Sequence, residues 1–459
     1  MRKISLIGFV MLIVSIPTFA GGLLTNTNQH AAFLRMLSRG ATFEIDGALS
    51  NPAGLAFLPN DGFHMGLSIQ SAFQTRNIDA SFMTYSGLDL SNPAAPVPTV
   101  SDQPYSKYYK GKAAAPVIPS VFAAYKKGDW TISGFFAITA GGGKASFDDG
   151  LPIFESAAMA KIFQKSLDGV AQGGPIMTPD KYIINSAMDG RQYIYSLQLG
   201  LSYKITDWLS AFAGARMNYF SGGYEGFLDA KVGDTDLMNL ALDCDQTGWG
   251  ITPILGADVK LGKWNIGLKY EFMTSLNLEN KTKKAEVRQM GNVMGDEGNP
   301  LADYKDGVNT PSDIPALLTA AVGYEILPTL RATVEYHHFF DKAAGMANDK
   351  QKALKHGTHE ILLGAEWDVT KQLTISGGYQ NTDYGLADDF QSDISFSCDS
   401  YSLGFGAAIK MTKHLTMNVA YFWTNYKDYN KMTETALGAS STTYRRTNKV
   451  FGLGVDYKF

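Results

Sequence analysis

Long segments in which apolar and polar side chains alternate are the feature of this 459-residue chain that most constrains its fold. The last segment is a clear case: Phe451, Leu453, Val455, Tyr457 and Phe459 fall on one face, and small or charged residues fall between them. A period of two places alternate side chains on opposite faces of a β-strand. A closed transmembrane barrel requires this pattern, because lipid surrounds its outside and water its inside.

The charged residues of the alternating segments indicate which face meets lipid. Lys269, Glu271, Glu366, Lys410 and Asp456 all lie opposite the apolar face. An arginine or lysine that faces lipid costs roughly 2–4 kcal/mol at the bilayer midplane. The apolar face is therefore the one expected to contact the membrane.

The alternating segments number about fourteen, an even number as in bacterial barrels. Short turns, expected in the periplasm, alternate with long loops, expected outside the cell. We predict an all-β fold, a transmembrane antiparallel β-barrel. A secreted β-sandwich or propeller is the alternative, but ordinary strands have about 5–6 residues, whereas a tilted membrane strand needs about 9–11. The predicted strands span residues 61–73, 115–126, 129–141, 191–204, 207–221, 246–261, 263–280, 313–327, 329–341, 357–369, 372–383, 397–411, 413–427 and 446–459.

Residues 1–20 have the composition of a secretory signal peptide. Arg2 and Lys3 precede an apolar stretch over residues 4–16, and Ala20 suits cleavage after it. This stretch is too short to cross a bilayer as a helix. Export combined with a barrel predicts the outer membrane of a Gram-negative-type cell.

Residues 21–60 do not alternate, and residues 30–37 have a helical pattern. We expect this segment to fold back into the lumen as a hatch, ahead of a barrel at residues 61–459, because so wide a barrel otherwise encloses an aqueous hole. The alternative is a disordered periplasmic tail, against which the apolar content argues. The apolar residues are Phe33, Leu34, Leu37, Phe43, Leu49, Leu55 and Phe57.

Two predicted loops are rich in apolar side chains. The loop at residues 142–190 contains a predicted amphipathic helix near residues 155–167, and the second loop spans residues 222–245. These side chains either pack together outside the membrane or form a capture site for an apolar ligand. The candidate ligand-binding residues are Phe154, Met159, Ile162, Phe163, Phe227 and Leu228.

Several motifs follow one another in a recognisable order along the mature chain. They are Asn51-Pro52-Ala53-Gly54-Leu55, Pro119-Ser120 with Tyr125-Lys126, Trp130 and Gly134, Trp249-Gly250 with Gly256, Trp264-Asn265-Ile266-Gly267 with Tyr270, and Leu453-Gly454-Val455-Asp456-Tyr457-Lys458-Phe459. In this order they resemble the FadL/TodX-type outer-membrane transporters of long-chain fatty acids and other hydrophobic compounds. The resemblance covers nearly all of the mature chain.

The resemblance implies a fourteen-stranded barrel plugged by a hatch whose motif is Asn51, Pro52 and Ala53. It also implies passive uptake: a hydrophobic small molecule docks between the loops, displaces part of the hatch and leaves sideways through the wall. The expected partners are this ligand, outer-membrane lipid, and the barrel-assembly machinery, through the C-terminal strand that ends at Phe459.

A lateral opening at a kinked third strand is part of this resemblance. The third predicted strand contains Gly134 and ends at Gly141, Gly142 and Gly143, and glycine in a strand marks a bulge or bend. A flexible loop entrance is the other interpretation of the triple glycine. Filling Gly134, or shortening the triple glycine, is expected to slow uptake in a barrel that still folds.

The sequence allows two interpretations of the inward-facing basic residues. The family's fatty-acid carriers pair the ligand carboxylate with basic residues. Arg216 and Lys269 are the candidates here, because alternation points both inward, as it does Arg331. Each belongs either to a headgroup site or to an ion-pair network with acidic residues such as Glu271 and Glu366.

Other kinds of chemistry have little support in the sequence. A net charge of -4 gives no indication of nucleic-acid binding, and we expect no cofactor, metal or enzymatic activity. There are two alternative functions: a lipid hydrolase that uses His338, and a barrel that anchors a surface or secretion partner. Cys244 and Cys398 form either a disulfide or, as we expect, two separate thiols.

Overall fold

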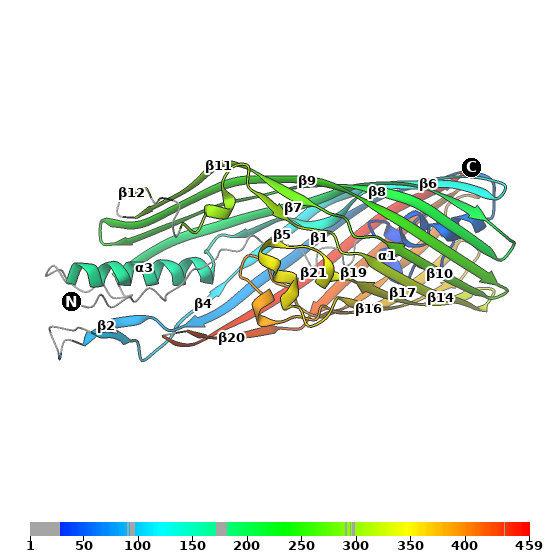
Figure 1. Ribbon diagram of the computed structural model, residues 1–459. Coiled ribbons are helices and arrows are strands. Elements are labelled where there is room, and N and C mark those ends of the chain that lie inside the picture. The colour runs from blue at the N-terminus through cyan, green and yellow to red at the C-terminus, as the bar shows by residue number, and fades with distance from the viewer. Residues whose placement is uncertain are drawn as a thin grey trace.

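The computed structural model describes residues 28–89, 91, 97–170, 181–289, 292–293, 295, 299–435 and 437–459. They form a closed antiparallel barrel of fourteen strands whose long axis runs across Figure 1. The predicted fold class is confirmed. The predicted signal peptide, residues 1–20, and the start of the next segment lie outside the described residues.

The barrel strands follow one another in chain order around the wall. They are β1 (Gly62–Phe82), β4 (Tyr105–Tyr109) with β5 (Gly111–Lys127), β6 (Trp130–Phe147), β7 (Tyr182–Lys204), β8 (Leu209–Val232), β9 (Thr235–Leu261), β10 (Trp264–Glu271) with β11 (Asn277–Gln289), β13 (Asn309–Pro311) with β14 (Leu317–Leu327), β15 (Leu330–Phe339), β16 (His359–Asp368), β17 (Leu373–Asp383), β18 (Ser400–Lys410), β19 (Leu415–Tyr426) with β20 (Tyr429–Thr435), and β21 (Gly438–Lys458).

The first and last strands close the barrel. Strand β1 pairs with β21 in an unbroken antiparallel register from His64 opposite Lys458 to Ser81 opposite Ser441. Closure matters because an open sheet edge in hydrocarbon leaves backbone groups unpaired, each of which costs several kcal/mol.

The two ends of the barrel differ, as Figure 1 shows. Short turns and the C-terminus lie at one end, here called the short-turn end. The other, the long-loop end, carries the remaining elements. These are the hairpin β2 (Tyr85–Asp89) and β3 (Val97–Val100), α3 (Pro152–Val170), β12 (Asn292–Val293), η3 (Ala302–Tyr304), η4 (Asp341–Ala343), η5 (Ala347–Ala353) and η6 (Asp388–Phe390).

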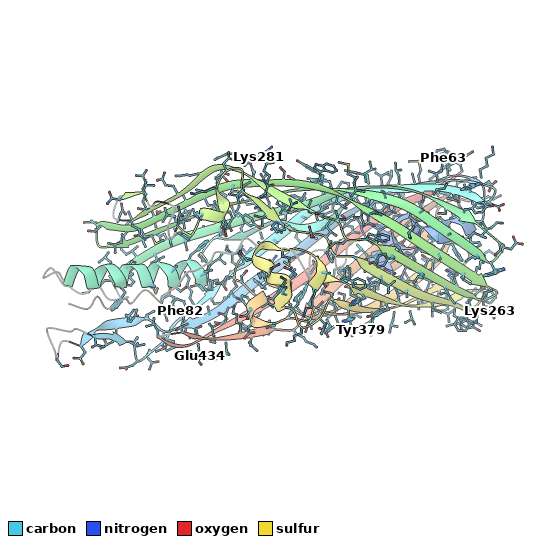
Figure 2. All side chains as sticks on the ribbon, viewed as in Figure 1. Phe63, Phe82, Lys263, Lys281, Tyr379 and Glu434 are labelled. Atoms are coloured by element: carbon cyan, nitrogen blue, oxygen red, sulfur yellow. The ribbon has the colours of Figure 1, made fainter. Side chains whose placement is uncertain are left out.

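The alternation of the sequence appears on the wall as an apolar outer face. Leu199 of β7 is 61% exposed and Leu453 of β21 is 54% exposed, whereas Gln198 and Ser202 between such positions are buried inside. Side chains project outward along the whole barrel in Figure 2. No helix among the described residues is long and apolar enough to cross a membrane.

Residues 28–60, called the luminal segment from here on, lie inside the barrel toward its short-turn end (Figure 1). The segment comprises α1 (Ala31–Arg35), α2 (Gly47–Ser50) and η1 (Ala53–Phe57). It is tied to the wall by hydrogen bonds: His30 Nε2 lies 2.9 Å from Asp456 Oδ1, and Gln198 Nε2 donates to the Ala48 carbonyl over 2.6 Å.

Buried ions connect the luminal segment to itself and to β16. Arg39 donates to both Asp46 oxygens over 2.8 and 2.7 Å, and Arg35 pairs with Glu366 and, over 3.1 Å, with Glu44. Removing one partner of such a buried pair costs about 3–5 kcal/mol, because the other charge stays buried. The lumen is therefore occupied by an ordered plug.

Two predictions about extent are wrong. Strands β1, β6, β7 and β21 run well past their predicted limits at the long-loop end, and the predicted strand 263–280 is divided into β10 and β11. Residues 222–245 are not a loop: they are the continuation of β8 and β9, which turn at Gly233. Side chains alternate between the two faces through residues 222–245 as well. Polar residues occupy many of the outer positions there, so the segment resembled a loop in the sequence. Cys244 consequently lies within β9, and both Cys244 and Cys398 are buried free thiols, as expected.

The apolar outer face leads to a test of membrane contact. Leu199→Arg is expected to lower the stability of the barrel in lipid by roughly 2–4 kcal/mol, because it faces the middle of the bilayer. The matched control is Ile205→Arg, which lies at the short-turn end on the same stretch of chain, where the cost is about 0–1 kcal/mol. Urea unfolding in vesicles measures both, and equal effects would contradict the assignment.

Candidate functional site

A groove with a volume of about 750 Å³ opens at the long-loop end, between α3 and the ends of β1, β20 and β21. Met159 and Phe163 of α3 line it together with Phe82 and Tyr85. The rings of Tyr85 and Phe163 stack with their centroids 3.9 Å apart. The groove thus has an apolar and aromatic part, and polar residues such as Lys431 and Glu434 complete its lining.

One carboxylate holds α3 in position beside this groove. Glu155 accepts hydrogen bonds from the hydroxyls of Tyr105 and Tyr109, both over 2.8 Å, and pairs with Lys107. Burial, together with Glu155, raises the pKa of Tyr105 and of Tyr109. Both hydroxyls therefore stay protonated as donors, and α3 is fixed to β4.

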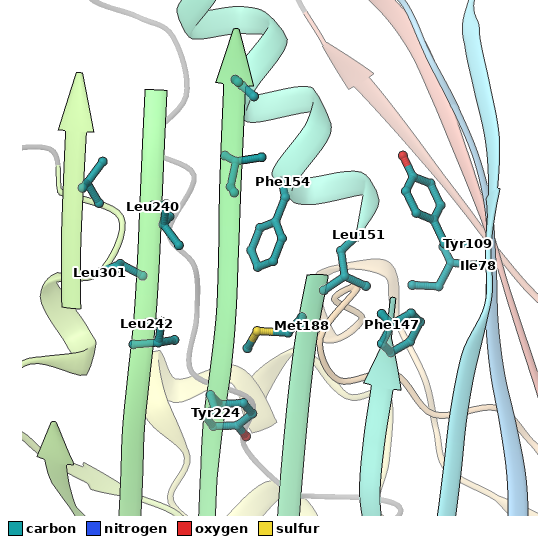
Figure 3. Packing of buried hydrophobic residues seen from close by; sticks show 14 of the residues in the cluster. Ile78, Tyr109, Phe147, Leu151, Phe154, Met188, Tyr224, Leu240, Leu242 and Leu301 are labelled. Carbon is teal, nitrogen blue, oxygen red and sulfur yellow. The ribbon is translucent and has the colours of Figure 1, made fainter. Parts of the chain in front are cut away.

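Below the groove lies a cluster of buried apolar side chains, part of which Figure 3 shows. Phe154 and Ile162, from the inner face of α3, pack there with Leu228 of β8. Phe227, the neighbour of Leu228, is 43% exposed on the opposite face of the same strand. Of the six apolar candidates, Met159 and Phe163 line the groove, three others pack beneath it, and Phe227 points away.

The inward-facing basic residues that the sequence suggested for a headgroup all form ion pairs with acidic side chains. Arg216 donates to both oxygens of Glu271 over 2.7 and 3.0 Å, and Lys269 lies 2.7 Å from the same carboxylate and 2.7 Å from the Leu49 carbonyl. Arg331 pairs with Asp368 over 2.8 Å. Of the two interpretations, the structure shows the ion-pair network.

These charges border a small cavity of about 70 Å³ between the luminal segment and the wall. Phe33 and Leu37 of the luminal segment, Thr139 of β6 and Arg216 of β8 are among its lining residues. Since about 10–15 Å³ of such space is enough for one water, the cavity has room for water.

The Asn-Pro-Ala motif fastens the luminal segment to three adjoining strands. Asn51 Nδ2 donates to Asp258 Oδ2 of β9 over 2.5 Å. The hydroxyl of Ser202 donates to the Pro52 carbonyl over 2.6 Å, and the hydroxyl of Ser210 donates to the Ala53 carbonyl over 2.7 Å.

The hydrogen-bonded ladder of the wall is interrupted between β5 and β6. The described pairs of these strands run from Gly111 to Ala114, which is opposite Lys144, and resume at Ser120, which is opposite Ala137. Residues 115–119 and 138–143 flank this interruption, called the β5–β6 gap from here on. It is a place where the barrel wall is not held together by backbone pairing.

Glycines shape the β6 side of the gap. Gly141 and Gly143 have φ angles of +105° and +80°, which side-chain-bearing residues rarely adopt. A Cβ on Gly141 would lie 2.0 Å from the Gln192 carbonyl oxygen, and one on Gly143 would lie 2.3 Å from that of Ala114. The triple glycine, Gly142 included, thus belongs to bulged β6 rather than to a loop.

Prolines reduce the cost of the gap on the β5 side. Pro116 and Pro119 have no backbone N–H to leave unpaired. On its other side β5 is irregular as well: the Pro116 carbonyl is directed toward β1, where it accepts a hydrogen bond over 2.6 Å from the hydroxyl of Ser71 at a register shift between β1 and β5. Inside the barrel, Ala115 and Ile118 of β5 pack in one cluster with Phe33 of the luminal segment.

Gly134 lies outside the gap. It pairs with Ala123 of β5 and Leu199 of β7, within an intact part of the ladder. It lines an apolar groove of about 520 Å³ on the wall, beside Ile132 and Phe136. A Cβ here would lie 2.2 Å from the Gln198 carbonyl oxygen, so a larger residue would disturb the wall itself.

These features define a class: a transmembrane β-barrel with a filled lumen and a local interruption in the pairing of its wall. No protein-family profile matches the sequence, and no curated protein sequence is a significant match. Solved structures are similar. A Pseudomonas aeruginosa FadL homologue has a TM-score of 0.62 at 16% identity, with 95% of this chain and 100% of that chain covered.

Two toluene transporters also have similar structures. Pseudomonas putida TodX has a TM-score of 0.55 at 12% identity, covering 97% of this chain and all of TodX. Ralstonia pickettii TbuX has a TM-score of 0.54 at 14% identity, covering 94% of this chain and all of TbuX. The chain therefore has the FadL/TodX-type fold, as the sequence resemblance indicated.

The bond between Asn51 and Asp258 leads to a test of the luminal segment. Asn51→Ala is expected to raise ion conductance across a planar bilayer, because Asp258 loses a donor worth about 1–3 kcal/mol and the segment loosens. Asn60→Ala, whose side chain is exposed, serves as the control. Conductance that stays at the unmodified level in N51A would show that this bond does not retain the segment.

Proposed function

We propose that this chain is an outer-membrane transporter that takes up hydrophobic small molecules, such as long-chain fatty acids or aromatic hydrocarbons, by passive diffusion. The observation that carries the proposal is the β5–β6 gap, because in hydrocarbon an unpaired stretch of wall is tolerated only where protein covers it or it lines a cavity. The toluene transporters among the similar structures support the same class of ligand.

Capture begins at the groove beside α3. An acyl chain gains about 0.8 kcal/mol for each methylene that leaves water, so the lining of Met159, Phe163 and Tyr85 favours an apolar ligand over a solute that prefers water. Polar residues also line the groove, and Lys431 among them is available to the headgroup of an amphiphile.

Passage through the lumen requires the luminal segment to move. The cavity of about 70 Å³ beside Arg216 and Lys269 is too small for a long acyl chain. The segment therefore acts as a hatch: the ligand displaces the part near Phe33, which packs against the inner side of the gap. Its Asn-Pro-Ala motif, Asn51, Pro52 and Ala53, stays fastened to the wall.

Exit is lateral, through the β5–β6 gap. A ligand that leaves here passes from the lumen directly to the acyl chains of the outer membrane and does not return to water. The groove around Gly134 lies on the membrane side, toward the short-turn end of the gap. A barrel that only anchors a partner gives no reason for an interrupted wall, so transport accounts for the structure better.

Targeting completes the proposal. Residues 1–20 are removed as a signal peptide during export, and the C-terminal strand, with Phe459 62% exposed on the wall, is presented to the barrel-assembly machinery. His338, the residue considered for a lipid hydrolase, contacts His359 and Phe340 at the outer surface.

Blocking the gap tests the proposal. Ala115→Phe and Ala140→Phe place a ring at the inner side of the gap, where both alanines are buried, and are expected to reduce uptake of hexadecanoate and toluene by at least about tenfold. Radiolabelled uptake into cells that lack other carriers for these compounds measures the effect.

The matched control is Ala113→Phe, which adds the same ring to the inner face of β5, two residues from Ala115, where the ladder is intact. Folding is checked by the gel mobility of the unheated barrel. If A115F and A140F fold and transport both compounds at the unmodified rate, the ligand does not leave through the gap.

A further inference from the structure

The groove around Gly134 on the outer wall, called the wall groove from here on, is a depression in the surface that faces lipid. Its floor is the pair of Ala123 on β5 and Gly134 on β6, which lie opposite each other in the ladder. The neighbouring outward positions carry larger side chains, which are exposed and stand around this floor. They are Phe63, Val121, Tyr125, Ile132, Phe136 and Leu199.

The lining of the wall groove is almost entirely apolar. Besides Tyr125, its lining residues with polar side chains are Ser133 and Gln198, and both are buried on the inner face of the wall. A hydrocarbon chain in such a depression contacts side chains on its flanks as well as beneath it. It therefore makes more van der Waals contacts than it does on a flat part of the wall.

The wall groove lies in the half of the membrane that is nearer the short-turn end. Along β5, Lys127 is four residues from Ala123 in the direction of that end. At about 3.3 Å per residue and a strand tilt of about 35–45°, Lys127 is roughly 10 Å closer to the membrane surface. Half of the hydrocarbon core is about 15 Å thick. A lipid tail in the wall groove therefore has its headgroup near Lys127.

The outward face at this level has the side chains of a membrane interface. Lys127 is exposed and lies opposite Trp130 in the β5–β6 hairpin, so both side chains belong to the outward face. The rings of Trp130 and Tyr203 lie side by side, with their centroids 4.3 Å apart. Tryptophan and tyrosine are enriched where the headgroups of a membrane lie. Lys127 thus stands at headgroup level, in line with the wall groove.

Lys127 forms no ion pair within the part of the chain that the structure describes. The acids nearby are bound by other lysines: Asp61 lies 3.2 Å from Lys126, and Asp129 lies 3.2 Å from Lys204. Asp61 is near enough for the charge of Lys127 to act on it, but the hydrogen bond to its carboxylate comes from Lys126. The ammonium group of Lys127 is therefore available to an anion from outside the protein.

We propose that this part of the wall binds one phospholipid of the periplasmic leaflet, with an acyl chain in the wall groove and the phosphate against Lys127. A phospholipid fits because its anionic group and its hydrocarbon follow each other in the order in which Lys127 and the wall groove lie along β5. A net anionic head such as phosphatidylglycerol is favoured, because a zwitterionic head already neutralises its own phosphate. The inference goes beyond the proposed function and does not depend on transport.

The bound lipid also lies beside the β5–β6 gap. Val121 and Phe136, at the long-loop edge of the wall groove, are two residues from Pro119 and Ile138, where the gap begins. The tail of the lipid therefore borders the membrane side of the gap, whose inner side the luminal segment covers. This position is held by one bound lipid rather than by lipids that exchange freely.

The contact with the headgroup is tested by asking which lipid stays bound. The barrel is placed in nanodiscs of equal parts phosphatidylglycerol and phosphatidylcholine with identical acyl chains, and the lipids that it retains are counted by native mass spectrometry. The unmodified barrel is expected to retain phosphatidylglycerol preferentially. Lys127→Gln is expected to lower the ratio of bound phosphatidylglycerol to phosphatidylcholine about fivefold, the effect of one lysine at an anionic surface. Lys127→Arg is expected to keep the ratio.

The matched control is Lys371→Gln, which removes an exposed lysine from another short turn and is expected to leave the ratio unchanged. Lys127→Gln lies at an exposed strand end, so the barrel is expected to fold normally, as the gel mobility of the unheated protein checks.

The contact with the acyl chain is tested by filling the wall groove. Ala123→Phe places a ring on its floor and is expected to reduce the number of retained lipids by one, whichever head they carry. Ala365→Phe adds the same ring to the outward face of β16, outside the wall groove, and is expected to change nothing.

Four results would overturn the inference. An unchanged lipid ratio in K127Q would remove the headgroup contact, and an equal fall in K127Q and K371Q would show general attraction by the charges of this end. An unchanged number of lipids in folded A123F would show that no chain occupies the wall groove. A dimer that A123F dissociates would assign the wall groove to a second copy of the chain. Uptake is not measured, so each of these results leaves the proposed transport function intact.

Discussion

The hydrocarbon of a bilayer offers no hydrogen bond to a peptide group, and this constraint governs the structure. Fourteen strands satisfy it by pairing around a closed cylinder, with β1 joined to β21 along their length. The exception described above, between β5 and β6, has the compensations that the constraint demands. Two prolines carry no donor, and the luminal segment covers the inside.

The luminal segment has to meet two opposing requirements: it must fill the barrel, and part of it must move when a ligand passes. Buried ion pairs around Arg35 and Arg39, and the anchors of Asn51, fix most of the luminal segment. Near the gap the contacts are different in kind, since Phe33 and Leu34 meet Ala115 and Ile118 through apolar packing. Apolar packing is non-directional. A hydrophobic ligand can therefore take the place of Phe33 and Leu34 against the wall and form equivalent apolar contacts there.

The sequence predicted the wall well and the site only in part, for physical reasons. Period-two alternation identifies the lipid face of each strand without reference to its neighbours, so Lys269 and Glu271 were correctly placed inside. The same signal, when polar residues occupy the outer face, looked like a loop at residues 222–245. If the alternation is continued through these residues, Phe227 falls on the outer face and Leu228 on the inner face, although the loop interpretation had placed both in one ligand site.

Contacts between distant strands were beyond the sequence. The alternation along β8 shows that Arg216 points inward. Only the pairing of β8, β9 and β10 in the structure shows that Glu271 lies close enough to bind it. The register of β1 against β21 was missed for the same reason: the first predicted strand ended at residue 73, and nothing local indicates which residue of the last strand lies opposite. The triple glycine was recognisable as a bend, whereas the length of the interruption required the pairing of both strands.

The most direct measurement of the central claim is photolabelling of the barrel in nanodiscs with a diazirine-bearing hexadecanoate, mapped by mass spectrometry. Membrane lipid brings the probe to any outward-facing residue, so the informative positions are Ile118 and Thr139, which are buried on the inner side of the gap. Lateral exit predicts labels on both, reduced by excess unlabelled hexadecanoate. Labels in the groove beside α3 and on the outer wall, with Ile118 and Thr139 unmodified, would contradict it.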